Sequence, residues 1–221
     1  MSVARFAVEA VLFDLDGTLV DSLPDIHETA NRMLAELGRP PRDIDEIRRF
    51  VGRGIPTLVT RCMTVGTQAT DAEIEAAIAV FRRHYAVVNG VHSRVFPGVL
   101  DTLEALRARG LPLACVTNKP EAFTLPLLER TGLAPYFALV VSGDTLPVKK
   151  PDPAMLHHAC ERLGVASALM IGDSANDALA ARAAGLPVLL VTYGYSEGMP
   201  VDTIECDGLL SDAREALPLL A

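Results

Sequence analysis

The chain has 221 residues, with 20 lysines and arginines against 28 aspartates and glutamates, and its formal net charge is −8. Such acidity disfavours a nucleic acid or an anionic membrane as the main partner, because both would repel it. The apolar fraction of 50% is enough to bury a core. No apolar stretch approaches the roughly 18 residues of a membrane span, and no cysteine spacing is typical of a zinc site. We therefore expect a globular, cytoplasmic protein with no nucleic-acid or membrane partner.

Short apolar runs that end in polar or glycine-containing turns recur along the chain. They cover residues 10–13, 113–116, 139–141, 168–171 and 188–191. Continuous apolar runs of this kind favour strands that are covered on both faces. Apolar residues at helical spacing mark the segments that alternate with them, at about 98–109, 120–132, 153–163 and 174–185. This alternation predicts an α/β fold with a doubly wound parallel sheet.

Residues 21–90 interrupt the alternation and contain no strand-like run. Helical spacing of apolar residues predicts helices within this stretch at about 26–37, 54–64 and 71–88. The sequence thus predicts an all-helical insert at 21–90, which separates the two parts of a core domain at 1–20 and 91–221.

Polar residues that follow the predicted strands are the candidates for chemistry. In open parallel sheets, ligands bind beyond the carboxyl ends of the strands, near the point where the strand order reverses. The candidates at these positions are Asp14, Asp16, Thr117, Asn118, Lys149, Lys150, Asp173 and Asp177. We expect these side chains to meet at one edge of the sheet.

The types of these residues point to group transfer. Asp14 and Asp16 lie two residues apart, so both carboxylates point to one side of an extended chain. One can act as a nucleophile and the other as a general acid and base. Asp173, together with Asp14, offers the hard oxygen ligands that Mg²⁺ prefers. Lys150 and the Thr117 hydroxyl would offset the charge of a phosphoryl group.

Four motifs in this chain resemble those of the haloacid dehalogenase-like phosphatases, in the same order. They are the DLDGT run at 14–18, Thr117-Asn118, Lys150-Pro151 and the run from Gly172-Asp173 to Asp177. The resemblance covers essentially the whole chain. It implies a Rossmann-like core, with the helical insert as the cap domain of the family's first subclass. Segments 146–151, 172–177 and 192–195 also resemble the bacterial phosphoglycolate phosphatases.

The resemblance implies a Mg²⁺-dependent phosphomonoesterase that acts on a small anionic ester, with 2-phosphoglycolate hydrolysed to glycolate and phosphate as the expected reaction. Asp14 would attack phosphorus and form an aspartyl-phosphate. Asp16 would protonate the leaving oxygen and then deprotonate the attacking water. Mg²⁺ would be held by the side chains of Asp14 and Asp173 and by the backbone carbonyl of Asp16.

The remaining candidates would bind phosphate or orient the groups that do. The resemblance implies that Thr117, Asn118 and Lys150 bind the transferring phosphoryl oxygens. It also implies that Asp177 orients a metal-bound water or Lys150. Arg53, in a glycine-containing loop of the insert, is a candidate to clamp a substrate carboxylate, with a solvated surface arginine as the alternative.

Other functions share parts of this pattern. A sugar phosphomutase uses the same pair of aspartates and stays open as an alternative. A receiver-like signalling module is disfavoured, because it lacks a helical insert and carries its phosphorylated aspartate on a later strand. A phosphonatase would need a lysine in the insert, and residues 1–91 contain none. The sequence leaves open the physiological substrate, a further ion, the roles of Tyr193 and Tyr195, and the choice between monomer and homodimer.

Overall fold

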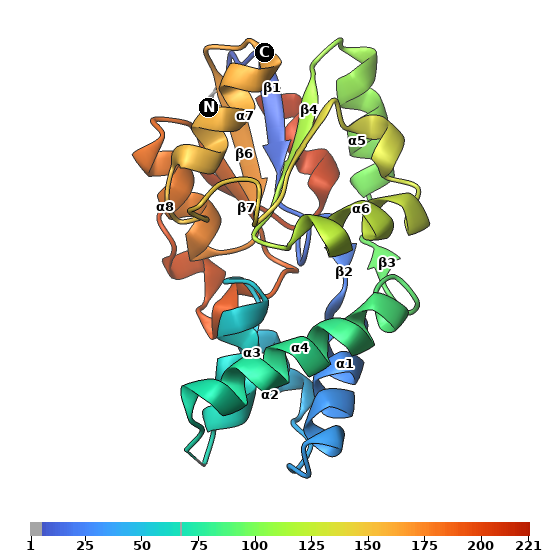
Figure 1. Ribbon diagram of the computed structural model, residues 1–221. Helices are drawn as coiled ribbons and strands as arrows, with labels where there is room; N and C mark the ends of the chain where they lie inside the picture. The colour runs from blue at the N-terminus through green and yellow to red at the C-terminus, as the bar shows by residue number, and fades with distance from the viewer. Residues whose placement is uncertain (1–5, 67) are drawn as a thin grey trace.

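The computed structural model describes residues 6–66 and 68–221. Residues 1–5 of the predicted core segment and residue 67 of the predicted insert lie outside these ranges. The chain forms a sheet covered by helices and, beyond one end of that sheet, a bundle of helices (Figure 1).

The sheet has six strands, and every neighbouring pair is parallel. Its spatial order is β5-β4-β1-β6-β7-β8. The strands are β1 (Ala10–Phe13), β4 (Leu113–Val116), β5 (Leu139–Val141), β6 (Ala168–Gly172), β7 (Val188–Val191) and β8 (Gly208–Leu210). From β1 the chain adds strands first on one side and then on the other, so the order reverses at β1. The predicted α/β fold with a parallel sheet is confirmed.

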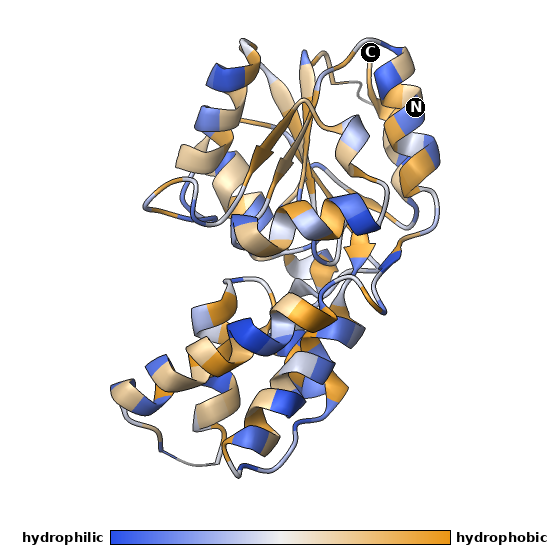
Figure 2. Ribbon diagram, turned by 45° about the vertical axis from the view of Figure 1, so that its right-hand side comes forward, coloured by the Kyte–Doolittle hydropathy of each residue, from blue (hydrophilic) through white to orange (hydrophobic). Residues whose placement is uncertain are grey.

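Helices cover both faces of the sheet, as the apolar character of its strands requires. They are α5 (Val99–Ala108), α6 (Glu121–Arg130), α7 (Ala154–Leu163) and α8 (Ala175–Ala183). Val11 and Phe13 of β1 pack in the core with α5 and α6, while Ala10 and Leu12 pack with α7 and α8. This two-residue alternation places apolar side chains on both faces, and the strands of Figure 2 are accordingly hydrophobic. Short 3₁₀ turns lie at η1 (Ala134–Tyr136), η2 (Ser196–Gly198), η3 (Val201–Thr203) and η4 (Ala213–Leu219).

Four helices form the bundle and enclose an apolar core of their own. They are α1 (Leu23–Glu36), α2 (Ile44–Phe50), α3 (Ile55–Thr64) and α4 (Asp71–Val88). The sequence prediction missed α2, although a capping box marks its start: Asp43 accepts from the first turn and Glu46 reaches back to the Asp43 amide. Within 6–66 and 68–221, no helix combines the length and the apolar character needed to cross a bilayer.

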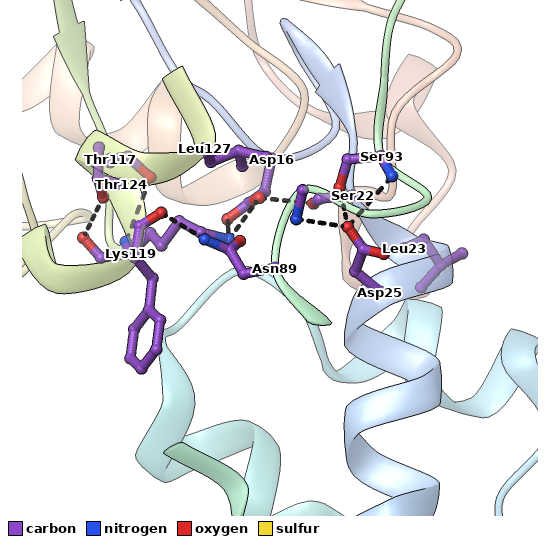
Figure 3. A network of polar contacts seen from close by, with 12 residues as sticks. Asp16, Ser22, Leu23, Asp25, Asn89, Ser93, Thr117, Lys119, Thr124 and Leu127 are labelled. Carbon is purple, nitrogen blue, oxygen red and sulfur yellow. Dashed lines mark hydrogen bonds and ion pairs between the residues drawn. The ribbon is translucent and has the colours of Figure 1, made fainter. Parts of the chain in front are cut away.

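Two short strands connect the bundle to the sheet. The chain leaves through β2 (Val20–Asp21) and returns through β3 (Arg94–Val95), and these strands pair in antiparallel fashion. The buried Asp25 carboxylate of α1 ties the outgoing segment to the returning one, because it accepts a hydrogen bond from the Ser93 amide at 3.1 Å (Figure 3). It also accepts one from the Gly90 amide at 2.8 Å. The predicted division between core and insert falls at this ribbon. The treatment of the bundle as a separate domain stays a prediction.

Candidate active site

The carboxyl ends of β1, β4 and β6 face the bundle and carry the residues of three motifs. Asp14 directly follows β1, and its amide donates to the Ile171 carbonyl of β6 at 3.0 Å. Gly17 turns the chain back with a φ of 88°, and a Cβ at this position would lie 2.3 Å from an oxygen of Asp173. Glycine is therefore required for the turn to pass this close to the carboxylate. The turn brings the first and fourth motifs into contact.

Three carboxylates meet at this edge of the sheet. Oxygens of Asp14, Asp173 and Asp177 all lie within 4.8 Å of one another. Burial raises the pKa of Asp14 to about 6, against the attraction of Lys150. Burial also raises the pKa of Asp173 well above its ordinary value, and the negative charges of Asp177 and Asp14 add to the effect. Buried carboxylates that repel one another suit a divalent cation that prefers oxygen ligands, such as Mg²⁺.

Asp177 already uses both of its oxygens. Oδ1 accepts from the Lys150 ammonium at 2.6 Å. Oδ2 accepts from the amides of Asp173 at 3.2 Å and Ser174 at 3.1 Å, and from the Ser174 hydroxyl at 2.9 Å. These bonds leave Asp14 and Asp173 as the carboxylates with capacity for a metal ion, and they fit the expectation that Asp177 orients its neighbours.

Lys150 is buried between two carboxylates. Its ammonium lies 2.9 Å from Asp14 and 2.6 Å from Asp177, and it donates to the Val116 carbonyl at 2.6 Å. Burial disfavours the charged amine, but Asp14 and Asp177 outweigh this effect and raise the pKa of Lys150. The structure therefore brings Asp14, Asp173 and a charged Lys150 to one point.

Thr117 and Asn118 follow β4, and both line the same pocket as Asp14 and Asp16. The Asn118 side chain is engaged with backbone atoms. Its amide donates to the carbonyls of Gly52 and Lys150, each at 2.9 Å, and its oxygen accepts from the Lys150 amide at 2.9 Å. Asn118 thus links a loop of the bundle to the segment that carries the buried lysine. A role of its side chain in binding phosphate stays a prediction.

Arg53 lies away from the other candidates. Its guanidinium pairs with Glu197 at 3.2 Å, its side chain is 55% exposed, and it is not among the residues that line the pocket. The expected clamp on a substrate carboxylate would require this guanidinium to leave Glu197 and turn inward.

Lys119 was not among the predicted site residues, yet it lies at the centre of the site. Its ammonium contacts both oxygens of Asp16, at 3.0 and 3.2 Å (Figure 3). It also bonds to the Tyr85 hydroxyl of α4 and lies 4.7 Å from the centroid of that ring. A signal existed in the sequence, because the chain has three lysines and this one comes two residues after Thr117.

A pocket lies between the sheet and the bundle. The sheet supplies a polar floor of Asp14, Asp16, Thr117, Asn118 and Lys119. The bundle supplies a mostly apolar wall of Ile26, Val51, Ile55, Leu58, Phe81 and Tyr85. Such a pocket can hold a small ligand whose charged end faces the sheet.

The loop after β7 connects Asp173 of the site to the start of the bundle. The Tyr195 amide donates to Asp173 at 2.7 Å, while its hydroxyl accepts from the amides of Ser22 and Leu23 at 2.8 and 2.9 Å. Tyr193 instead packs against the ring of Phe96, with centroids 4.5 Å apart. Neither tyrosine lines the pocket.

The chain is similar to known proteins along most of its length. A family model described as haloacid dehalogenase-like hydrolase matches residues 8–185. Phosphoglycolate phosphatase of Thiobacillus denitrificans is 48% identical over 95% of this chain and 94% of its own. The plasmid phosphoglycolate phosphatase of Cupriavidus necator is 49% identical over 100% of this chain and 96% of its own.

The solved structures include one with nearly the same fold. A protein of Haemophilus somnus, described as a predicted phosphoglycolate phosphatase, superposes with a TM-score of 0.90 at 34% identity, over 95% of this chain and 96% of that one. The family resemblance inferred from the four motifs is therefore confirmed. This chain is an enzyme that belongs to the haloacid dehalogenase-like hydrolases.

Proposed function

We propose that this chain is a Mg²⁺-dependent phosphatase that hydrolyses 2-phosphoglycolate to glycolate and phosphate. The observation that carries the proposal is the convergence of Asp14, Asp173 and Lys150 beneath a small pocket. The names of the full-length relatives support the substrate. We propose a cytoplasmic monomer or homodimer whose partner is this small ester.

The proposed reaction has two steps. The Asp14 carboxylate attacks phosphorus while Asp16 gives a proton to the departing glycolate oxygen, which leaves an aspartyl-phosphate. Asp16 then takes a proton from water, and this water attacks phosphorus and releases phosphate and the Asp14 carboxylate. Lys150 and Thr117 bind the phosphoryl oxygens and offset their negative charge.

A bound Mg²⁺ would supply positive charge for the phosphoryl group and for the attacking carboxylate. Its proposed ligands are the side chains of Asp14 and Asp173 and the backbone carbonyl of Asp16. The fit rests on the buried carboxylates, which repel one another when no cation lies between them. Asp177 would keep Lys150 and the start of α8 in place.

We also propose that residues 21–90 act as a cap domain. The apolar side chains of α1, α3 and α4 that line the pocket support this role. A wall of this kind excludes bulk water from the phosphoryl group and reads the other end of the substrate.

Steady-state kinetics with Mg²⁺ would test the proposal on 2-phosphoglycolate, glucose 1-phosphate and a nucleoside monophosphate. We expect phosphate release with the highest kcat/KM on 2-phosphoglycolate, and a loss of more than about 1,000-fold in Asp14→Asn. An equal rate on all three esters would refute the substrate. Conversion of glucose 1-phosphate to its 6-phosphate isomer without phosphate release would favour a phosphomutase. Full activity of Asp14→Asn would refute the mechanism.

A further inference from the structure

We propose that Lys119 determines substrate specificity, because its ammonium binds the carboxylate of the leaving group. The site would then select phosphate esters of small 2-hydroxy acids. This inference rests on the proposed phosphatase function and adds the group that recognises the part of the substrate beyond phosphate.

The charges around the pocket single out this lysine. Of the residues that line the pocket in the described part of the chain, Lys119 is the one basic residue, and Asp14 and Asp16 lie beside it. A substrate with a carboxylate needs a cation there, because the two aspartates would otherwise repel it.

Lys150 and Arg53, the two other candidates for this task, do not line the pocket. The Lys150 ammonium already contacts Asp14, Asp177 and the Val116 carbonyl. Arg53 pairs with Glu197 outside the pocket.

The position of Lys119 matches the chemistry of such an ester. Asp16 is the proposed acid for the ester oxygen, and the Lys119 ammonium lies 3.0 and 3.2 Å from its two carboxylate oxygens. In a 2-hydroxy acid ester, the carboxylate carbon is two bonds from that ester oxygen, roughly 2.4 Å away by standard bond lengths. A cation that contacts the acid is therefore within reach of the substrate carboxylate as well.

The surroundings of Lys119 hold the ammonium at this point. Its side chain is 3% exposed, and Tyr85 of α4 contributes both its hydroxyl and its ring face. Ile55, Leu58 and Phe81 form the wall beyond and offer no charge. The pocket therefore matches one carboxylate close to the ester and disfavours a second charged group further out.

The test compares 2-phosphoglycolate with 2-hydroxyethyl phosphate, in which a hydroxymethyl group replaces the carboxylate. We expect Lys119→Met to lower kcat/KM for 2-phosphoglycolate by about 100-fold, mainly through KM. It should also reduce the preference for 2-phosphoglycolate over 2-hydroxyethyl phosphate, which lacks the carboxylate, at least about tenfold. Lys119→Arg should restore much of the preference, because it keeps the charge. Arg214→Met is the control for the loss of a cation, since its guanidinium pairs with Asp101 and Asp212 on the surface and does not line the pocket.

The ratio between the two substrates separates recognition from acid catalysis. If Lys119→Met slows both esters by the same factor, the lysine acts through Asp16 alone and the proposal is wrong. Lys119→Gln replaces the Met variant if the latter does not fold, and the same ratio decides. If the unaltered protein hydrolyses glucose 1-phosphate but not 2-phosphoglycolate, the proposed substrate fails instead, independently of any variant.

Discussion

Each carboxylate of the first motif faces one lysine. Lys150 lies 2.9 Å from Asp14, and Lys119 lies 3.0 Å from Asp16. The pairs differ in their surroundings, because Lys150 is enclosed by the sheet whereas Lys119 lines the pocket. We infer that the first pair prepares the nucleophile and that the second serves the leaving group.

Asp177 has no proposed contact with the substrate. A change at this residue therefore tests how far the two lysine–aspartate pairs depend on a neighbouring group. Asp177→Asn removes the negative charge beside Lys150. It also places an amide group among the donors that bond to Oδ2 of Asp177 in the unaltered protein. We expect kcat to fall about 100-fold and the free energy of unfolding to fall by about 3 kcal/mol. Kinetics and denaturant unfolding would measure the two effects.

Asp101→Asn is the control for that variant, because its ion pair with Arg214 lies on the surface with 66% of the aspartate side chain exposed. Surface pairs contribute at most about 1 kcal/mol, so this change should leave both measurements nearly unaltered. Equal losses in the two variants would contradict the role given to Asp177.

The raised pKa of Asp14 predicts how the stability of the metal-free protein depends on pH. The pKa moves from 3.8 to about 6 on folding, chiefly through burial. The charged form therefore destabilises the fold, an effect absent below the ordinary pKa and complete above the folded one. With a chelator present, Asp14→Asn should gain in Tm relative to the unaltered protein, by about 5 °C between about pH 5 and pH 8. A Tm difference that is constant over this range would contradict the shift.

At the start of α1, the residue in the N-cap position does not cap the helix, and a side chain from another element does. Ser22 occupies the N-cap position, but its hydroxyl donates to Asp16 at 2.5 Å and makes no cap bond. The Tyr195 hydroxyl accepts from the free amides in its place. The first helix of the bundle thus begins on two groups that also contact the site.

Tyr195→Phe should therefore loosen the start of α1 while leaving the bond from its own amide to Asp173. We expect a loss of about 1 kcal/mol in the free energy of unfolding and faster hydrogen exchange at the amides of Ser22 and Leu23. Tyr193→Phe is the matched control, because it removes one bond to the Thr18 carbonyl and none at the helix start. Exchange that rises equally in both variants would contradict the capping role.

The sequence predicted the elements with a strong apolar pattern, including the three-residue β5, and missed several other short ones. The first two sheet strands were expected at 10–13 and 113–116 and lie at those residues. β2 and β3 were not predicted because two residues each carry too little periodicity, and β8 was not predicted because its Gly-Leu-Leu run offers only two apolar residues. All three strands depend on pairing with distant partners. The missed α2 has seven residues, which is fewer than a clear helical stripe needs.

For the molecule as a whole, the strand ends explain which site residues could be anticipated. Asp14, Thr117 and Asp173 each directly follow a strand, so the parallel topology predicts that they meet. The contacts of Lys119 with Tyr85 and of Asn118 with Gly52 join the sheet to the bundle. Such contacts depend on how two parts of the chain pack, which no local pattern encodes.

Metal binding should stabilise the whole molecule, because Mg²⁺ would bind the folded site and not the unfolded chain. At a free Mg²⁺ concentration about 100 times the dissociation constant, we expect the free energy of unfolding to rise by about 2.7 kcal/mol. The measurement is the rise in Tm when Mg²⁺ is added to protein from which metal has been removed with a chelator. Gly194→Ala should abolish this rise, because its Cβ would lie 2.3 Å from the Cβ of Asp173.

Gly208→Ala provides the comparison, since its Cβ would meet only the end of the Leu189 side chain, at 3.0 Å. We expect this variant to keep the rise in Tm. A rise that survives in Gly194→Ala would place the cation elsewhere.

The carboxylate of Asp25 has a consequence for how the two parts of the molecule move. It fixes the outgoing and returning crossings to each other through the amides of Gly90, His92 and Ser93. If the two connecting segments moved independently, the bundle could both twist and slide against the sheet. Because Asp25 joins the segments, we expect the bundle to rotate about one point, the β2–β3 ribbon. We therefore expect substrate entry and product exit to require one hinge rotation, in which the bundle moves away from the sheet as a rigid unit.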